Sequence, residues 1–299
     1  MISILSIGSS KPDVIGDTAV LKAAVHPIYS TLTREYISTT RNSSVKEALA
    51  NVTKTTTDLA LEAASQAIER AGISKEQIGL ILADCSTPVE TIPGESQRLG
   101  SRLGLKIPAF DIISGSMAFV NFFETIRAWK KKKLPEYILC VSANSPTQRV
   151  NYAEGKERFH FSDGAAALIV SLQHKGKLSL KGIHSFSDSV EKGSLEIDLF
   201  GHVKVEEVQA VKNHSGCVSL TREFLKNGNR EAQIFTDNFP FADMQPDFLY
   251  PKQANNLGSG VINALNDNWD KLKACDTLGL LVVSLETNGG GLVLMEVES

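Results

Sequence analysis

The chain has few cysteines, few aromatic residues and no long hydrophobic run. Of its 299 residues, four are cysteine and 7% are aromatic. The cysteines are Cys85, Cys140, Cys217 and Cys275, with no CxxC pair and no histidine pair nearby. This spacing argues against a zinc site or a disulfide framework, so we expect no metal and a reducing, cytoplasmic location. Because Cys85 and Cys140 lie in or beside apolar, strand-like runs, we expect both to pack in the core.

The sequence also lacks the features of membrane and nucleic-acid partners. Its longest apolar run, 278–283, is far too short to span a bilayer. Residues 1–8 lack the basic start and long apolar region of a signal peptide. The formal net charge is -3, whereas nucleic-acid binding requires a basic face. We therefore expect no membrane and no nucleic acid among its partners.

The first half of the chain alternates strand-like with helix-like segments. Apolar runs at 2–7, 78–83, 110–113 and 137–143 predict strands, the first of them ended by Gly8. Residues 58–71 place small apolar side chains on one helical face, with Thr57 as N-cap and Gly72 at the end, and 95–103 predicts a second helix. This alternation predicts an α/β fold.

The second half repeats this organisation less clearly. Strands are predicted at 178–183, 232–236, 278–285 and 291–297, the last two joined by a glycine turn, and helices at 206–225 and 259–268. No Pro-rich or Gly-rich linker separates the halves. We therefore expect one body with an internal duplication, formed by residues 1–172 and a shortened second half, 173–299.

The most informative stretch is 108–129, PAFDIISGSMAFVNFFETIRAW. A short apolar strand meets the small residues Ser114, Gly115 and Ser116, and a helical pattern that is apolar on most sides then begins. Such a helix is expected to be buried. A turn into a helix N-terminus presents unpaired N–H groups, which suits a nucleophile or a carbonyl oxygen. Ser116 is the candidate residue on this turn.

Four segments resemble the 3-oxoacyl-ACP synthase III branch of the thiolase superfamily. They are TDLALEAASQAIERAGISKEQIGLILADCSTP (57–88), AFDIISGSMAF (109–119), FSDGAAALIV (161–170) and the triple glycine 289–291. The resemblance implies an α/β thiolase fold, five-layered αβαβα from two duplicated halves, and usually a dimer. It also implies an acyl-CoA or an acyl-carrier protein as substrate, with no further cofactor.

The family's catalytic Cys, His and Asn match this chain unequally. Its Cys lies in a pattern similar to A-F-D-x-x-x-x-C, which places Ser116 at the nucleophile position. The position of the His, after the strand at 232–236, is occupied by Asp237, and no histidine follows His214. The Asn turn resembles ANNLGSG, making Asn255 the match with Asn256 next to it; a second alignment sets PKQAN at 251–255 on the family's P-H-Q-A-N. Gly289, Gly290 and Gly291 match a loop near the substrate.

These differences from the family pattern weigh against decarboxylative condensation. A helix N-terminus activates a thiol, but a serine hydroxyl needs an adjacent base. The missing His also removes an oxyanion donor, which is typically worth roughly 3–4 kcal/mol. Asp237 would be anionic near neutral pH and would repel an enolate, unless burial keeps it protonated.

Three hypotheses follow for the function. The first, which we favour, is a non-condensing partner, like a chain-length factor, of an active ketosynthase in fatty-acid or polyketide biosynthesis. The second is an acyltransferase or priming enzyme that forms an acyl-Ser116 intermediate, with Asp237 as base or orienting group and Asn255 as donor. The third is a structural protein that binds an acyl ligand.

Several of the candidate residues also have a purely structural interpretation. Ser116 suits the start of a buried helix simply because it is small, Asp237 suits a turn, and the triple glycine suits close backbone approach. Lys130, Lys131, Lys132 and Lys133 suit a solvated helix end, or alternatively the docking of an acidic acyl-carrier protein. Asn144 follows a strand and predicts a loop, either ordinary or close to a dimer contact.

Overall fold

Ten strands of the described chain form one hydrogen-bonded series. The computed structural model describes residues 2–10, 54–146, 163–187, 195–197, 203–205, 233–236, 248–249, 257–274, 276–284 and 289–298. The series runs β10-β9-β11-β12-β6-β1-β5-β4-β2-β3. Its strands are β1 (Ser3–Ser10), β2 (Ile78–Asp84), β3 (Ala109–Asp111), β4 (Tyr137–Asn144), β5 (Gly164–Ser171), β6 (Leu178–Ser187), β9 (Gln233–Thr236), β10 (Phe248–Leu249), β11 (Thr277–Ser284) and β12 (Gly289–Val297). Strands β7 (Leu195–Ile197) and β8 (Val203–Val205) form a separate antiparallel pair.

The series consists of two five-stranded halves with the same topology. The first has the order β3-β2-β4-β5-β1 and the second β10-β9-β11-β12-β6. In each half the first three strands are parallel, and the last two are antiparallel to their neighbours. One arrangement of strands is therefore used twice.

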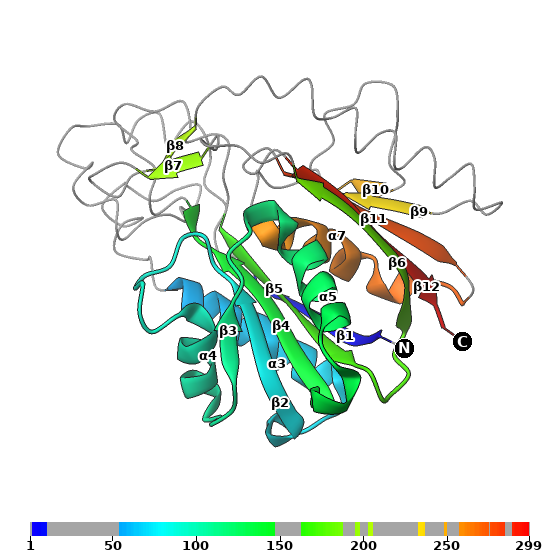
Figure 1. Cartoon of the computed structure of the whole chain (residues 1–299), viewed down its shortest axis with the longest axis horizontal. Helices are drawn as coiled ribbons and strands as arrows, with labels where there is room; N and C mark the ends of the chain where they lie inside the picture. The colour runs from blue at the N-terminus through cyan, green and yellow to red at the C-terminus, as the bar shows by residue number, and fades with distance from the viewer. Residues whose placement is uncertain are drawn as a thin grey trace, which may run out of the picture.

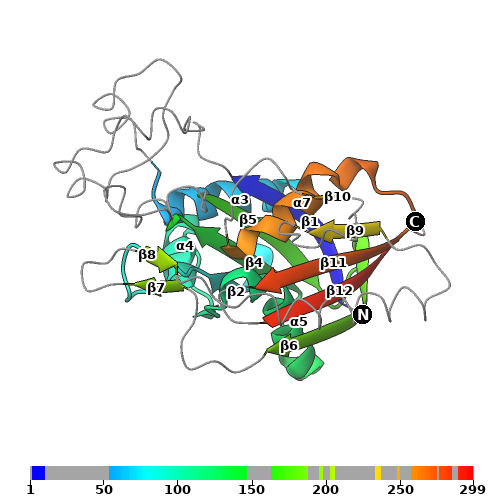
Figure 2. The ribbon, with the colours of Figure 1, turned by 90° about the horizontal axis from the view of Figure 1, so that it is seen from above.

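The two halves meet at β1 and β6 and then separate. Ser3 and Ile4 pair with Ser179 and Leu178, and the Leu180 N–H donates to the Ile2 carbonyl over 2.9 Å. Helices α5 (Ala118–Ala128) and α7 (Gly260–Asp267) lie between the separated halves (Figures 1 and 2). Helix α5 contacts β4, β6 and β12, whereas α7 contacts β1, β5, β9 and β11, so both helices touch both sheets.

Two apolar clusters follow from this layering. The larger fills the space between the sheets and includes Phe119, Phe122 and Phe123 of α5, all fully buried. The smaller lies on the other face of the first sheet, which α3 (Thr56–Ala71) and α4 (Glu95–Leu103) cover. Helices α3 and α4, the first sheet, helices α5 and α7, and the second sheet thus form four layers. The predicted helix at 206–225 falls outside the residues that the structure describes. No helix among the described residues is long and apolar enough to cross a membrane.

Helix α5 is as buried as its sequence predicts, and α4 has the predicted bounds. The prediction for α3 is wrong at its start, because Thr55, not Thr57, is the N-cap. The Thr55 Oγ1 accepts the Asp58 N–H over 3.2 Å, and an Asp58 carboxylate oxygen accepts the Thr55 N–H over 2.9 Å. Thr57 is instead a buried helical residue whose hydroxyl accepts from Arg98.

Strands β1, β6 and β12 extend beyond their predicted bounds because of their neighbours. Strand β6 continues past Ile183 to Ser187, which pairs with Gly289 of β12. Strand β1 does not end at Gly8 but continues to Ser10, which pairs with Ala165 of β5. Strand β12 begins at Gly289, paired with Ser284, so Gly289 and Gly290 are strand residues and not a turn.

The Asp of the A-F-D sequence has a structural role. Asp111, at the end of β3, accepts the Glu95 N–H through Oδ2 over 2.7 Å and the Ser96 N–H through Oδ1 over 2.8 Å. Its carboxylate therefore caps the N-terminus of α4, which satisfies two N–H groups that have no partner within the helix.

Gly8 sets the distance between β1 and α3. A Cβ atom at Gly8 would lie 2.1 Å from the Ala63 carbonyl oxygen and 2.6 Å from the Ala67 nitrogen. Both atoms belong to the helix backbone, so the contact cannot be relieved by turning a side chain. The alanines on this face of α3 match this closeness, because a larger residue would hold the helix away.

We predict that Gly8→Ala lowers the free energy of unfolding by about 3 kcal/mol, the upper part of the range for overpacking a core. Gly72→Ala is the control: Gly72 has a positive φ but open space around it, so only about 1 kcal/mol is expected. Urea unfolding of both variants measures the difference. An equal loss in the two variants would contradict the close-packing argument.

Candidate active site

Ser116 lies in a turn between β3 and α5. The turn is the short 3-10 helix η4 (Gly115–Met117), in which Gly115 has a φ of 53° and the Met117 N–H donates to the Ser114 carbonyl over 3.1 Å. A positive φ is easy for glycine alone, so Gly115 allows the sharp change of direction. Ser116 is 5% exposed. We call Ser114–Met117 the first elbow.

A buried carboxyl group lies beneath the first elbow. Asp84, the last residue of β2, accepts the Ser114 N–H through Oδ1 over 2.9 Å and also accepts the Gly115 N–H. Its Oδ2 accepts the Ser142 hydroxyl over 2.9 Å and the Asn144 side-chain amide over 3.2 Å. The carboxyl thus receives four neutral donors from two segments of the chain, the first elbow and β4.

Burial dominates the acidity of this group. Because the Asp84 side chain is fully buried, removal from water raises its pKa to about 6, although the hydrogen bonds from Ser114, Ser142, Asn144 and Gly115 act in the opposite direction. Asp84 therefore titrates close to neutral pH.

A second elbow from the other half of the fold packs against this carboxyl. The 3-10 helix η9 (Leu257–Ser259) precedes α7 as η4 precedes α5, and Leu257 has a φ of 56°, close to that of Gly115. A Cβ at Gly258 would lie 2.7 Å from the Asp84 Oδ2, 2.6 Å from the Ser142 Oγ and 2.6 Å from the Ala118 Cβ. Only glycine fits there, so the backbone of the second elbow touches the base of the first.

The other predicted site residues differ in what the structure shows of them. Asp237, Asn255 and Asn256 lie outside the described residues, although Thr236 and Leu257, which flank them, are buried. Gly291 lies on β12 opposite α5, where a Cβ would come within 2.8 Å of Val120. The triple glycine therefore meets the helix that begins at the first elbow.

The lysines at the end of α5 lie away from the elbow. Helix α5 ends at Ala128, and η5 (Lys131–Lys133) follows it. Lys130, Lys132 and Lys133 are exposed. Eleven helical residues separate them from the first elbow, roughly 16 Å at 1.5 Å per residue.

Sequence reasoning missed Asp84, Ser142 and Asn144. The expectation of a loop at Asn144 is wrong: it is the fully buried last residue of β4, and its Oδ1 accepts the Ser86 N–H over 2.7 Å. The available signal was a polar residue at the carboxyl end of two adjacent apolar strands, because such ends meet at one edge of a parallel sheet.

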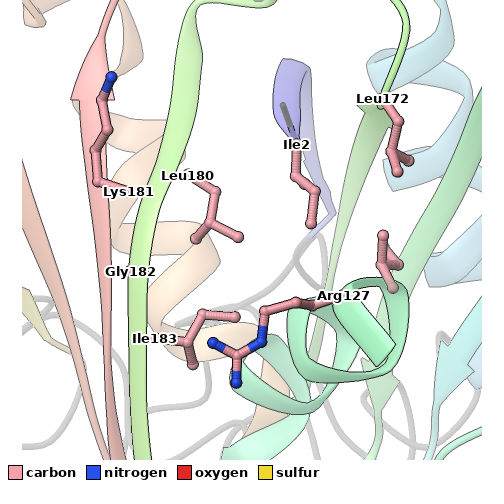
Figure 3. A pocket seen from close by; sticks show the side chains of 8 residues that line it. Ile2, Arg127, Leu172, Leu180, Lys181, Gly182 and Ile183 are labelled. Atoms are coloured by element: carbon pink, nitrogen blue, oxygen red, sulfur yellow. The ribbon is translucent and has the colours of Figure 1, made fainter. Parts of the chain in front are cut away.

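A separate crevice of about 240 Å³ opens where β1 and β6 diverge, at the far end of α5 (Figure 3). Its lining is mainly aliphatic and comprises Ile2, Ile126, Arg127, Leu172, Leu180, Lys181, Gly182 and Ile183. Arg127 pairs with Glu124, and Lys181 pairs with Glu296 over 2.8 Å. The cations at this crevice thus already have carboxylate partners.

The described cysteines are structural. Cys85 and Cys140 are buried, as predicted, and burial raises the pKa of both thiols well above the usual range. Neither suits a nucleophile at neutral pH. Among the described residues, no group of His, Cys, Asp or Glu could hold a metal ion.

Comparisons with known proteins agree on one family. The chain is 26% identical over 259 residues to the β-ketoacyl-ACP synthase III of Chlamydia trachomatis serovar D, covering 85% of this chain and 77% of that protein. It is 33% identical over 179 residues to the enzyme of the same name from Campylobacter jejuni, covering 59% and 53%. No protein-family model matches the chain.

The fold comparison extends over the whole chain. The crystal structure of 3-oxoacyl-ACP synthase III from Aquifex aeolicus superposes with a TM-score of 0.77 and 19% identity, covering 99% of this chain and all of the other. The two duplicated halves therefore define a thiolase-fold protein. The sequence relatives carry the name of the family that the motifs predicted, and this fold agrees with them, so both comparisons support that resemblance.

The titration of Asp84 predicts a specific pH dependence of stability. Its pKa is about 6 in the folded protein and about 4 when unfolded. Because the pKa of Asp84 is higher in the folded protein, its protonation adds to the free energy of unfolding. This contribution is complete below pH 4 and is lost as the pH rises through 6. A difference of two units corresponds to about 3 kcal/mol.

We expect the free energy of unfolding of wild type, minus that of Asp84→Asn, to fall by about this amount between pH 4 and pH 7. Urea unfolding at a series of pH values measures it. Ser142→Ala, which keeps the carboxyl group, should retain the wild-type trend. A difference between wild type and Asp84→Asn that stays constant with pH would rule out a raised pKa at Asp84.

Proposed function

We propose that this chain is a non-condensing member of the β-ketoacyl-ACP synthase III family that completes an assembly with an active ketosynthase-type subunit. The observation that carries the proposal is the chemistry of the first elbow. Ser116 supplies a hydroxyl where the family uses a thiol, and the buried carboxyl of Asp84 lies beneath it. A serine needs an adjacent base, and a nearby anion opposes negative charge on the serine or on an enolate.

The proposal includes a second subunit at the exposed edge of the first sheet. Strand β3 ends the strand series. Exposed apolar side chains lie on it or near it in the chain (Phe110 and Ile113), on Trp129, whose ring contacts Phe110, and on the connection from β2 to α4 (Val89 and Ile92). We call these five residues the apolar edge. Ile92 is 86% exposed and Ile113 66%, while the rings of Phe110 and Trp129 pack edge to face at 6.0 Å. Such a group next to a sheet edge favours another protein subunit.

The occupant we propose is a chain of the same fold. It is a copy of this chain when the protein is purified alone, and a cysteine-containing ketosynthase when the two are made together. In that assembly this chain would shape the partner's acyl pocket or its choice of chain length. The exposed Lys130, Lys132 and Lys133 offer a cationic surface to an acidic acyl-carrier protein.

The competing function is acyl transfer through Ser116. Its position at the start of the buried helix α5 favours this candidate, because the family places its nucleophile at the matching residue. An acyl-CoA or acyl-carrier protein would then donate the acyl group. A third function, binding of an acyl ligand without transfer, would show as a rise in melting temperature with no covalent product.

We predict that wild-type protein gains no acyl-sized mass when it is incubated with a panel of acyl-CoAs and acyl-carrier proteins. Intact-protein mass spectrometry of wild type beside Ser116→Ala is the measurement. A gain that Ser116→Ala abolishes would establish a seryl acyl-enzyme and overturn the proposal. With no gain, co-purification with a cysteine-containing relative is the expected positive result.

We further predict that Ile92→Asp, which places a charge in the apolar edge, converts the dimer of the isolated chain into a monomer. Light scattering coupled to size-exclusion chromatography reports the mass. Lys175→Asp, at an exposed site on the β5–β6 connection, is the control and should remain dimeric. A wild-type protein that is monomeric, or an Ile92→Asp variant that stays dimeric, would refute this interface.

A further inference from the structure

Asp84 contacts both elbows of the duplicated fold. It receives the Ser114 and Gly115 N–H groups of the first elbow, and its Oδ2 lies where a Cβ of Gly258 in the second elbow would clash. The same hypothetical Cβ would touch Ala118, two residues beyond Ser116. Ser116 is thus flanked on both sides by residues that meet Asp84 or the glycine packed against it.

In the part of the chain that the structure describes, the hydrogen-bond donors to this carboxyl are all neutral. Its donors are two backbone N–H groups, the Ser142 hydroxyl and the Asn144 amide. The next residue, Cys85, keeps its proton, because burial and the nearby carboxyl groups of Glu95, Asp84 and Asp111 raise its pKa. The described stretch of the second elbow and α7, from Leu257 to Leu265, carries no charged side chain. When Asp84 is ionised, its charge is therefore held by dipoles and not by a cation.

These contacts have two consequences for position 116. The N–H groups of Ser114 and Gly115 point at Asp84, so they are not available to an anion on the substrate side of the turn. A buried negative charge next to the turn also raises the energy of any anion formed at residue 116. The hydrogen bonding and the charge of Asp84 therefore both disfavour an anion at residue 116.

We propose that Asp84 is the positioning residue of the first elbow and that its charge suppresses the formation of an anion at position 116. The inference deepens the proposed non-condensing function and rests on it for its biological meaning. It is nevertheless tested without any acyl substrate. A purely structural Asp84 would hold the turn but leave the acidity of a group at residue 116 unchanged.

The test uses a thiol as the reporter of anion formation. Ser116→Cys places a sulfur where Ser116 holds its hydroxyl, and the rate of alkylation by iodoacetamide follows the thiolate fraction. Peptide-level mass spectrometry separates this thiol from the four native cysteines. The rate is measured from pH 5 to pH 9 in Ser116→Cys and in the double variant that adds Asp84→Asn.

The proposal predicts faster alkylation of the double variant at pH 7.5, by about tenfold, because removing the buried like charge of Asp84 should lower the pKa of the thiol by about one unit. The ratio of the two rates should approach one below pH 5, where Asp84 is protonated. Adding Ser142→Ala instead removes a donor but keeps the charge, so it should not accelerate alkylation. If Asp84→Asn and Ser142→Ala accelerate the alkylation of Ser116→Cys equally, Asp84 has only a structural role and the proposal is wrong.

A single-variant measurement protects the test against misfolding of Asp84→Asn. In Ser116→Cys itself, Asp84 ionises between pH 5 and pH 7 and disfavours the thiolate as the pH rises. A plot of the logarithm of the alkylation rate against pH should therefore have a slope below one in this range. A slope of one across that range would overturn the proposal. This outcome is distinct from failure of the proposed function, which acylation of Ser116 in the wild-type protein would show.

Discussion

The structure depends on a carboxyl group removed from water at the junction of its two halves. Asp84 ends a strand of the first sheet, supports the turn that holds Ser116, and packs against the glycine in the matching turn of the second half. Burying a charge is costly unless its oxygens are fully hydrogen-bonded, and here four donors meet it. The residues that supply them come from β4 and the first elbow, so sheet and turn must both be in place before the group is satisfied.

Much of the fold is readable from local patterns in the sequence. The Ala-rich face of α3, the apolar strands and the buried helix α5 all follow from hydrophobic periodicity, because each element must bury one face or both. The errors lie at ends that depend on partners distant in sequence. Strand β1 passes through Gly8 because β5 pairs with it, and Thr57 is inside its helix because Thr55 makes the capping box.

The candidate site was only partly predictable. Ser116 could be found because small residues interrupt an apolar pattern at the start of a helix. Asp84, Ser142 and Asn144 could not be found in this way, since residues some sixty positions apart meet only through strand pairing. Gly258 shows the same limit. The sequence around it predicts a turn, but only glycine fits at this position because side chains of the other half pack against it.

The position of β1 in the strand series has a consequence for how the chain is made. Its residues 3 and 4 lie between partners at 170–171 and 178–179, in the middle of ten strands. Strand β1 leaves the ribosome long before its neighbours β5 and β6 are synthesised. It therefore lacks both strand partners during the synthesis of some 170 residues. Contacts this distant in sequence are slow to form and expose strand edges in the meantime. The strand that joins the two halves is thus also the one most in need of protection during synthesis.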